Sequence, residues 1–436
     1  MHDCNADIVR INEARGVDKM RVLIISNYYP PLELGGWEQL TRDVACQLNK
    51  RGHTVHILTS NYRADEMQKT EPDVDRILYL ESYDHARYHA HYTLLHRWQE
   101  RQNQRHLAQA VAHVAPDIIF INGMWNLPSS VAWQAEQLCP GRVVYYIASY
   151  WPTEAGAHTA YWLDQPDNPW LRLPKQWIGT FVRRTLITGT PRNQLDFALV
   201  LCVSAFMQDY MIKEAGVPSS QTRVVHNGIN PTTFSMRCLR EDPPSLRLLY
   251  AGRLSPDKGV HTSIEGLGHI LQADPSQPIT LSVIGSGTPE YETSLRRLAD
   301  ELGISQAVRF YGQVARSQMP DIVAQHDVLL FTSMWPEPLA RMTQEAMACG
   351  LVVIGTETGG TPEILHDGEN GLTFEAGNGL ALAEKIAQVS KDPGLRNQLA
   401  RAARQTIEER FTIDRMVDEI EYHFTSIMSQ PEQTVE

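Results

Sequence analysis

The sequence predicts an α/β protein with two Rossmann-like domains, each a parallel β-sheet with helices on both faces. Short apolar runs alternate with helical stretches, and this alternation occurs in two successive series. Strands that are separated by helices are typical of parallel sheets. The chain has 436 residues, which exceeds the size at which one hydrophobic core keeps growing, so two domains of about 200 residues each are expected.

The first series starts at Met20 and contains five apolar runs that we expect to be strands. Two longer stretches between these runs have the pattern of helices. The expected strands are MRVLIIS (20–26), TVHILT (54–59), DIIFI (117–121), RVVYYIA (142–148) and ALVLCV (198–203), and helices are expected at 37–50 and around 94–114.

The second series starts near Leu246 and again contains five expected strands, each followed by a helix pattern. Two further helices are expected near the C-terminus, before a polar tail. The expected strands are LRLLYAG (246–252), ITLSVIG (279–285), VRFYG (308–312), VLLFTS (328–333) and LVVIGT (351–356), and the late helices are expected at 393–410 and 412–427.

A linker is expected between the two series, in NGINPTTFSMRCLREDPPS (227–245), because its Asn-Gly and Pro-Pro pairs are typical of turns and loops. The domain boundaries follow from this position. We expect an N-terminal tail at 1–19, an N-terminal domain at 20–235, a C-terminal domain at 236–410 and a final helix with a tail at 411–436.

The composition excludes several classes of function. A formal net charge of −12 argues against a general nucleic-acid binder, which needs a basic surface. The six cysteines are scattered without a CxxC pair, as expected for reduced thiols in a cytoplasmic protein. The N-terminus has no apolar block like that of a secretion signal, and no run of about 18 apolar residues occurs. We therefore expect a cytoplasmic protein.

Nearly every expected strand is followed by Gly, Ser, Asn or a charged residue. Ligands of open parallel sheets bind beyond the carboxyl ends of the strands. The sequence therefore predicts one ligand-binding cleft between the two domains.

The segment EPLARMTQEAMACGLVVIGTETGGTPE (337–363) carries two acids around an expected helix start. Pro338 suits the first helical position, which would place Glu337 just before the helix and Glu345 about two turns inside it. The free N–H groups of a helix start attract anionic oxygen. We therefore expect this segment to hold a sugar that is attached to a diphosphate.

Arg253 and Lys258 follow the strand that ends at Gly252, and a Ser-Pro turn separates them. We expect both side chains to point to one spot, where the fixed fork of Arg and the mobile charge of Lys can neutralise a departing diphosphate. The alternative is a solvated basic turn.

The sequence lacks an Asp-x-Asp triplet after an apolar strand, which is the usual metal site of sugar-nucleotide enzymes. Its Asp-x-Asp triplet, Asp73 to Asp75, precedes the apolar run RILYL, so we interpret it as surface charge. We expect metal-independent chemistry with no cofactor, in which protein cations take the place of a metal ion.

Together with a Gly35-Gly36 loop, the two acids and the two cations make the chain resemble the retaining GT-B glycosyltransferases of family 4 (group 1). The resemblance covers about residues 20–427, and five further motifs in the family's order support it. These motifs are VVHNGIN (224–230), GRLSPDKG (252–259), GSG (285–287), VRFYGQV (308–314) and GGTPE (359–363).

The resemblance implies transfer of a sugar from a nucleotide diphosphate donor with retention at the anomeric carbon. It implies that Glu337 contacts the donor sugar, that Glu345 binds the ribose, and that the last helix crosses back to the N-terminal domain. The expected catalytic residues are Arg253, Lys258 and Glu337, and the expected donor-binding residues are Gly35, Gly36, Gly285, Gly312, Val314, Leu339, Ala340, Arg341, Glu345, Gly359 and Gly360.

Two positions depart from the family's pattern. Many relatives have a His after the fifth N-terminal strand, where this chain has Ala148. Relatives usually have Gly-Leu where this chain has Ala340-Arg341; Arg341 could select an acidic sugar, although we expect it to face solvent. The acceptor-side candidates near the first departure are Asn122, Ser149, Tyr150, Trp151 and Glu154.

Residues 170–184, WLRLPKQWIGTFVRR, interleave aromatic and basic side chains. Such a mixture can rest on an anionic membrane surface and bring an enzyme to a lipid-linked acceptor. The alternative is an ordinary helix with its aromatic residues in the core. Separately, we interpret His53 as a turn residue rather than a catalyst.

The sequence thus predicts a metal-independent retaining glycosyltransferase that uses a UDP- or GDP-sugar and a glycan or lipid-linked acceptor in polysaccharide or cell-envelope synthesis. It would be cytoplasmic or peripheral at the inner face of the membrane. Two alternatives stay open: a sugar-nucleotide epimerase of the same fold, and a catalytically silent subunit that binds a nucleotide sugar, which the residue at 148 suggests.

Overall fold

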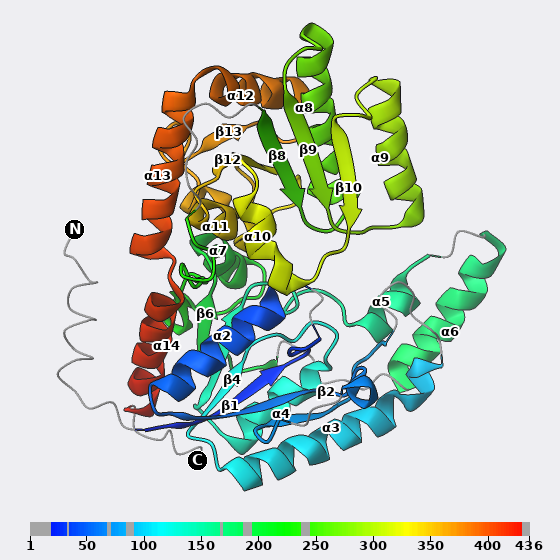
Figure 1. The fold of residues 1–436 in the computed structure, drawn as a ribbon. Coiled ribbons are helices and arrows are strands. Elements are labelled where there is room, and N and C mark those ends of the chain that lie inside the picture. Colours follow the sequence, from blue (N-terminus) through cyan, green and yellow to red (C-terminus); the bar gives the residue numbers. More distant parts are fainter. Residues whose placement is uncertain are drawn as a thin grey trace. The chain divides into compact units, whose positions relative to one another are not determined.

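The computed structural model describes residues 19–32, 35–67, 71–83, 91–165, 169–185, 194–236 and 245–429, without the side chains of 169 and 183–185. These residues form two compact units, each with its own parallel sheet (Figure 1). Unit 1 comprises the described residues within Met1–Val203, Met207–Val225 and Val417–Glu436, and unit 2 comprises those within Ser204–Phe206 and His226–Met416. The predicted α/β class with two Rossmann-like domains is therefore confirmed.

In the described part of unit 1, seven strands form a parallel sheet in the order β3-β2-β1-β4-β5-β6-β7. All five predicted apolar runs are strands of this sheet, and β3 and β7 are its two edges. The strands are β1 (Arg21–Ser26), β2 (Thr54–Ser60), β3 (Val74–Leu78), β4 (Ile118–Ile121), β5 (Val143–Ile147), β6 (Leu199–Cys202) and β7 (Thr222–Val224).

The helices of the first series follow the predicted pattern, and α2 has the predicted bounds. They are α2 (Trp37–Lys50), α3 (Tyr92–Val114), α4 (Ser129–Leu138), α5 (Ala157–Leu163), α6 (Arg172–Thr185) and α7 (Ala205–Lys213). The final helix α14 (Ile413–Met428) belongs to unit 1 from Val417 onward. Its Phe424 ring packs edge-on against Phe120 of β4, with ring centroids 5.3 Å apart. The ring of His53 is buried, and its Nε2 atom lies 2.6 Å from Glu421 Oε1, so His53 attaches α14 to β2.

In the described part of unit 2, six strands form a parallel sheet in the order β10-β9-β8-β11-β12-β13. The interior is aliphatic, because alternating strand residues such as Leu248, Val283 and Ile354 are fully buried. The elements are β8 (Leu246–Ala251), β9 (Ile279–Ile284), β10 (Val308–Gly312), β11 (Val328–Phe331), β12 (Val352–Thr356), β13 (Leu372–Phe374), α8 (Val260–Ala273), α9 (Pro289–Glu301), α10 (Met319–Ala324), α11 (Arg341–Ala348), α12 (Gly379–Lys391) and α13 (Pro393–Arg410).

The start of the predicted linker is buried structure rather than a free connection. The N–H of Ile229 donates to Phe411 O at 3.0 Å, and Ile229 is fully buried. A Cβ atom on Gly228 would lie 2.2 Å from Thr412 O, so the glycine is needed for this close backbone approach. The Asn-Gly signal therefore marks a packed turn, while residues 237–244 of the same stretch lie outside the described residues.

The strand order reverses direction once in each sheet. The reversal lies between β1 and β4 in unit 1 and between β8 and β11 in unit 2. Ligands of open parallel sheets bind beyond the carboxyl ends of the strands at such a point. The loops after these four strands are therefore the places to look for functional side chains.

Candidate functional site

Lys258 and Glu337 form an ion pair at the reversal point of unit 2. Lys258 ends a short 3₁₀ helix (Pro256–Lys258) after β8, and Glu337 follows β11. The Ser333 hydroxyl also donates to Glu337, with Ser333 Oγ 3.2 Å from Glu337 Oε1. The two charged side chains are 21% and 16% exposed, so they are partly shielded from water but remain reachable by a ligand.

Hydrogen bonds join the two loops that carry this ion pair. The N–H groups of Met334 and Trp335 donate to Asp257 O at 2.8 and 3.1 Å. The Thr332 hydroxyl donates to Lys258 O at 3.1 Å. The positions of Lys258 and Glu337 are therefore fixed by backbone contacts, which prepares the charges before any ligand arrives.

Arg253 does not share the partner of Lys258. Its Nη2 atom lies 3.1 Å from Asp257 Oδ2, and its side chain is 66% exposed. Burial alone would raise the pKa of Asp257, but the nearby Ser255 hydroxyl and the charges of Arg253 and Lys258 lower it overall. The two cations therefore have different partners, because Asp257 holds Arg253 while Glu337 holds Lys258, and the expectation that both side chains point to one spot stays a prediction.

The helix after Glu337 begins later than predicted. α11 starts at Arg341 with Ala340 as its N-cap residue, so Pro338 is not the first helical residue. Glu345 consequently lies about one turn inside the helix instead of two. The N–H groups at the start of α11 still lack intrahelical partners, as at any helix N-terminus. They begin at Arg341 rather than at Leu339.

Tertiary hydrogen bonds explain the later helix start, because they hold the loop from Glu337 to Leu339 outside the helix. The Ser204 hydroxyl donates to Pro338 O at 2.6 Å, and the Gly360 N–H donates to Glu337 O at 2.7 Å. A Cβ atom on Gly360 would lie 2.1 Å from Pro338 O. Gly359 is equally close to Glu337. The two glycines of GGTPE therefore let this loop pack against the backbone of the Glu337 loop.

Two arginines hold the carboxylate of Glu345, which is 1% exposed. Arg316 contacts both carboxylate oxygens, with Nη1 2.8 Å from Oε2, and Arg341 Nε lies 3.1 Å from Oε1. Arg316 also lies over the ring of Phe234, 5.5 Å from its centroid. The expectation that Arg341 faces solvent is wrong, since its side chain is 11% exposed: the four-residue spacing on α11 places it beside Glu345.

Glu363, the last residue of GGTPE, joins three segments of unit 2. Its two carboxylate oxygens accept hydrogen bonds from the N–H groups of Ala205 and Phe206 at 2.9 and 3.0 Å. His226 Nε2 lies 2.9 Å from Glu363 Oε2. Burial alone would raise the pKa of Glu363, but the bonds from His226 and the two N–H groups lower it overall. The carboxylate is therefore kept charged at the start of α7.

The loops after β9 and β10 extend the same edge of unit 2. Gly285 has φ +130°, and a Cβ atom there would lie 1.8 Å from Gly252 O. Its N–H donates to Gly312 O at 2.9 Å. Val314 follows in the same loop and is half-buried. Arg341 and Glu345 lie in α11, and the other predicted residues of unit 2 lie at or just after the carboxyl ends of β8, β9, β10, β11 and β12.

In unit 1, Gly35 and Gly36 precede α2 near the reversal between β1 and β4. Gly36 is the N-cap residue of α2, and the Gly35 N–H donates to Glu38 Oε2 at 3.0 Å. Trp37 stacks on Tyr146 with ring centroids 5.5 Å apart. The start of α2 is therefore fixed by an aromatic stack as well as by hydrogen bonds.

Two of the acceptor-side candidates are buried in the interior of unit 1. Asn122 is fully buried, and its amide donates to Thr41 Oγ1 at 3.1 Å. Trp151 is 4% exposed and packs near Phe197. Apolar packing and an internal hydrogen bond therefore hold both side chains inside unit 1, and their role as acceptor-side residues stays a prediction.

The other three acceptor-side candidates remain accessible. Ser149 and Tyr150 are half-buried, and Glu154 is exposed. The ring of Tyr150 packs edge-on against Tyr210, with centroids 4.7 Å apart. Tyr150 and Glu154 belong to one turn, in which the Glu154 N–H donates to Tyr150 O at 3.0 Å.

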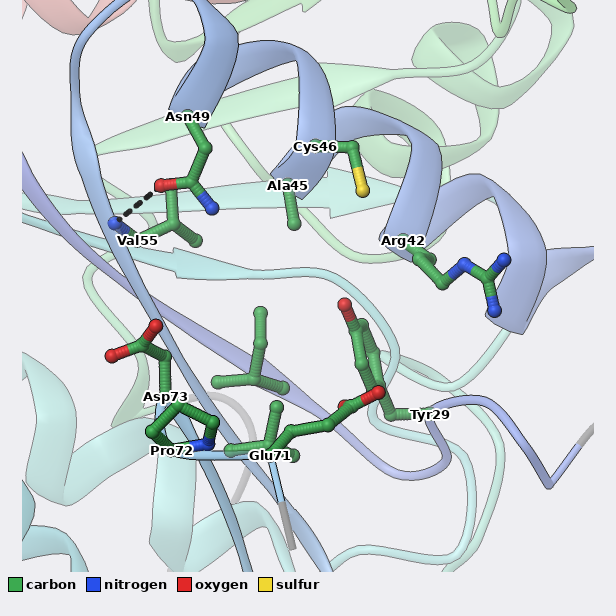
Figure 2. A pocket seen from close by; sticks show the side chains of 11 residues that line it. Tyr29, Arg42, Ala45, Cys46, Asn49, Val55, Glu71, Pro72 and Asp73 are labelled. Atoms are coloured by element: carbon green, nitrogen blue, oxygen red, sulfur yellow. Dashed lines mark hydrogen bonds between the residues drawn. The ribbon is translucent and has the colours of Figure 1, made fainter. Parts of the chain in front are cut away.

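A separate cavity of about 380 Å³ lies between α2 and the segment that leads into β3 (Figure 2). Figure 2 shows Arg42 and Cys46 on α2 above Glu71 and Asp73, with Tyr29 at one side. None of the predicted site residues lines this cavity. Asp75, the second acid of the Asp-x-Asp triplet, lies in β3 and pairs with His56 at 2.9 Å, which agrees with its interpretation as a charged surface residue.

No group of three or more His, Cys, Asp or Glu side chains in the described ranges is arranged as metal ligands. No helix in the same ranges is both long and apolar enough to cross a membrane. Within the aromatic and basic segment, Trp170, Trp177 and Phe181 are exposed, so the alternative that places them in the core is wrong. The side chains of Arg183 and Arg184 lie outside the described residues.

Sequence reasoning missed Arg316 and did not predict the contacts of Ser204 and Glu363, although both follow expected strands. Arg316 follows Gly312 and Val314 in one loop, so its position after a strand end was a usable signal. Glu363 belongs to a quoted motif, but its partners are about 140 to 160 residues away in the sequence and no local pattern indicates them.

Comparisons with known proteins match both halves of the chain to glycosyltransferases. Residues 34–233 match the family described as Glycosyltransferase Family 4, and residues 234–406 match Glycosyl transferases group 1. Glycogen synthase of Mycobacterium tuberculosis is 25% identical over 409 residues, which cover 90% of this chain and 91% of that protein. D-inositol 3-phosphate glycosyltransferase of Streptomyces bingchenggensis is 30% identical over 48% of each chain.

Solved structures share the fold over nearly the whole chain. A glycosyltransferase from Rickettsia africae superposes with a TM-score of 0.70 at 18% identity, over 95% of this chain and all of that one. HepE of Anabaena, in complex with UDP-glucose, superposes with a TM-score of 0.68 at 20% identity, over 93% of this chain and all of that one. The chain with its two Rossmann-like units thus has the GT-B fold, as the sequence predicted.

Proposed function

We propose that this chain, which is a glycosyltransferase with the GT-B fold, moves a sugar from a UDP or GDP donor to a glycan or lipid-linked acceptor with retention at the anomeric carbon. The observation that carries the proposal is the Lys258–Glu337 ion pair, which two joined loops hold at the strand-order reversal of unit 2. A sugar diphosphate offers hydroxyl groups to an acid and phosphate oxygens to a cation, so it can take up both members of the pair.

In the proposed reaction, the bond between the anomeric carbon and the leaving phosphate oxygen breaks, and the acceptor oxygen bonds to the same face of that carbon. The acceptor proton passes to the leaving phosphate, which departs as the nucleoside diphosphate. Lys258 stabilises the negative charge that grows on this phosphate, and Glu337 orients the sugar through its hydroxyls. Protein cations thus supply the charge, and we propose that no metal ion is needed.

Further groups of unit 2 would complete the donor site. Arg253 is exposed and can leave Asp257 to meet the diphosphate. The N–H groups at the start of α11 offer positive charge to phosphate oxygens. Glu345 would meet the ribose, with Arg316 and Arg341 holding its carboxylate in position. Gly312 and Val314 would face the base, and in unit 1 Ser149, Tyr150 and Glu154 are the proposed acceptor contacts.

The relatives support the proposed donor and pathway. A solved structure with the same fold is described in complex with UDP-glucose, and another is a glycosyltransferase involved in lipopolysaccharide biosynthesis. We accordingly place the reaction in polysaccharide or cell-envelope synthesis on the cytoplasmic side of the membrane.

The test measures release of UDP or GDP from a panel of nucleotide sugars, with and without acceptor and with and without a chelator. We expect acceptor-dependent release that the chelator leaves unchanged, and NMR of the product should show the anomeric configuration of the donor. Isomerised donor without release would identify an epimerase instead. Donor binding without release from any donor and acceptor pair would identify a silent subunit, and inversion of the anomeric carbon would contradict the proposed front-face reaction.

A further inference from the structure

Helix α6 of unit 1, which is labelled in Figure 1, carries a stripe of exposed apolar side chains. Leu173 and Trp177 are 67% and 79% exposed, and Ile178 and Phe181 are exposed as well. Spacings of three and four residues place these side chains on one face of the helix. Trp170, in the 3₁₀ turn just before α6, is the most exposed of these residues at 88%.

The opposite side of α6 is packed, so the exposed stripe is not simply the outside of an undocked helix. Gly179 is buried, and a Cβ atom there would lie 3.0 Å from Trp162 O of α5. Val182 is 6% exposed, and Lys175 Nζ lies over the ring of Tyr161 at 4.4 Å. α6 therefore already buries one face against α5 while it presents its other apolar face outward.

α5 is in turn attached to the main body of unit 1. The Trp162 indole N–H donates to the Thr93 hydroxyl in the first turn of α3, at 3.0 Å. His158, also on α5, is 1% exposed and packs against His96 of α3 with ring centroids 4.3 Å apart. The stripe is thus displayed on a hairpin of two helices that is anchored to α3.

The charge of this segment has the sign opposite to that of the chain. Residues 169–185 contain Arg172, Lys175, Arg183 and Arg184 and no acidic residue, although the chain has a formal net charge of −12. Tryptophan and basic residues together are typical of helices that lie in the interface of an anionic bilayer. A second copy of the chain would bring two basic segments together, whereas anionic lipid offers the complementary charge.

We propose that the α5–α6 hairpin docks on an anionic lipid bilayer, with the α6 stripe among the headgroups. This docking stands independently of the proposed reaction. If the proposed function holds, it narrows the acceptor to a lipid-linked one, because the enzyme would work at the surface where such an acceptor lies.

The experiment is co-sedimentation of the full chain with vesicles of phosphatidylcholine alone or mixed with phosphatidylglycerol. We expect binding only to the mixed vesicles, and weaker binding as salt is raised. The double substitution Leu173→Glu and Trp177→Glu should lower the apparent affinity at least about tenfold, because it adds two negative charges and removes two apolar anchors. The matched control is Leu380→Glu, an exposed apolar residue of unit 2, which should bind like the unmodified chain.

Far-UV circular dichroism and the affinity for UDP, measured by calorimetry, should be the same in all variants, so a loss of fold or of donor binding is distinguishable from a loss of docking. Arg172→Glu, which leaves the stripe intact, should also weaken vesicle binding. Unchanged vesicle binding of the double variant would overturn the proposal. The proposal would also be overturned if the unmodified chain did not bind vesicles but formed a dimer in sedimentation velocity, and if the double variant were a monomer.

Discussion

The two units share a sheet plan but differ in the chemistry at their strand ends. In unit 2, charged side chains hold one another: Lys258 pairs with Glu337, and Arg316 and Arg341 pair with Glu345. In unit 1, aromatic rings dominate the corresponding edge. Trp37 stacks on Tyr146, and Tyr150 packs on Tyr210.

This difference reflects the ligands that we propose for the units. A diphosphate carries fixed charge, so a site for it needs fixed countercharges at defined positions. An acceptor that is a glycan or a lipid-linked glycan carries hydroxyls and apolar faces, which aromatic side chains can accommodate in several ways. Most of the family's sequence motifs accordingly lie at the charged edge of unit 2. The departure from the family's pattern at Ala148 lies at the aromatic edge of unit 1.

The largest effect that the comparison predicts is the loss of Lys258. Lys258→Ala should lower the turnover number by roughly 10²- to 10³-fold, the usual cost of removing one group that stabilises developing charge. UDP affinity should fall much less, because other cations of unit 2 remain. The measurement is steady-state kinetics together with calorimetric UDP binding.

The control is Arg253→Ala. Arg253 is exposed and pairs with Asp257, so its loss should reduce turnover less than the loss of Lys258. Equal effects of the two substitutions would show that both cations act on the leaving group together, as the sequence suggested, and that the ion pairs seen here are rearranged when the donor binds.

A second prediction tests how tightly the loops of unit 2 are packed. Gly360→Ala should destabilise the protein by about 2–4 kcal/mol and reduce activity, because the new Cβ atom would lie 2.1 Å from Pro338 O and force the Glu337 loop away. Thermal unfolding and activity assays measure the two effects.

Gly368→Ala is the matched control in the same unit. Gly368 has φ +73°, but a Cβ atom added there would meet nothing within 4 Å, so only the backbone conformation is strained, at about 1–2 kcal/mol. Similar losses for the two variants would contradict the close packing of the GGTPE loop.

A third prediction concerns acid. Burial lowers the pKa of His96 to about 4 and that of His158 to about 3, with smaller effects of Arg97 on His96 and of His96 on His158. Both values lie below the ordinary value of about 6.5, so the unfolded chain binds protons first as pH falls. The free energy of unfolding that depends on these neutral histidines is therefore fully present in unit 1 above about pH 6.5 and is lost progressively toward pH 4. The loss at pH 5 is on the order of 1–2 kcal/mol per histidine.

Unit 2 should respond only in stronger acid. Its Glu363 and Asp367 have lowered pKa values: burial opposes the shift, and hydrogen bonds, from His226 to Glu363 and from the Thr373 N–H to Asp367, outweigh it. The stability that these two ionised carboxylates contribute is present above their pKa values in the unfolded chain, which are about 4, and is lost as pH falls below those values. Hydrogen exchange at pH 7.5 and pH 5.0 should show α3 and α5 losing protection before α11 and α12. His158→Gln should reduce the difference in Tm between the two pH values, and equal loss of protection in both units would contradict the prediction.

The comparison also explains what could be predicted from the sequence. Runs of apolar residues identified ten of the strands, and α2 and α13 have their predicted bounds, because these features depend on local pattern. Sequence reasoning did not count the edge strands β3, β7 and β13, since β3 carries two charged residues and the other two span only three residues each. The predicted start of the helix at Pro338 was wrong because a hydrogen bond from the distant Ser204 to Pro338 O holds this residue outside α11.

The site was predictable to the same extent. Glu337, Lys258 and the glycine loops lie at one edge of unit 2, which strand-end reasoning can find. The partner of each charge was not predictable: Arg316 and Glu345 are 29 residues apart, and nothing local to either residue indicates the other. Burial of Asn122 and Trp151 likewise depends on the packing of other segments against them.

The smallest effect that we predict is that of Arg316, which holds Glu345 rather than the donor itself. Arg316→Ala should weaken UDP binding about tenfold, since a buried carboxylate that loses one of its partners is less well oriented and less readily kept charged. Because Glu345 is proposed to bind the ribose, the same substitution should hardly change the binding of 2′,3′-dideoxy-UDP, which lacks the ribose hydroxyls.

Calorimetry with the two nucleotides, on the unmodified chain and on Arg316→Ala and Arg316→Lys, separates this positioning role from a general loss of stability. Lys restores the charge but not the contact with both carboxylate oxygens, so its UDP affinity should lie between those of the other two proteins. An equal loss of affinity for both nucleotides would mean that Arg316 contacts the diphosphate or the base. Arg316 would then be a direct donor contact at the charged edge of unit 2, in addition to holding Glu345.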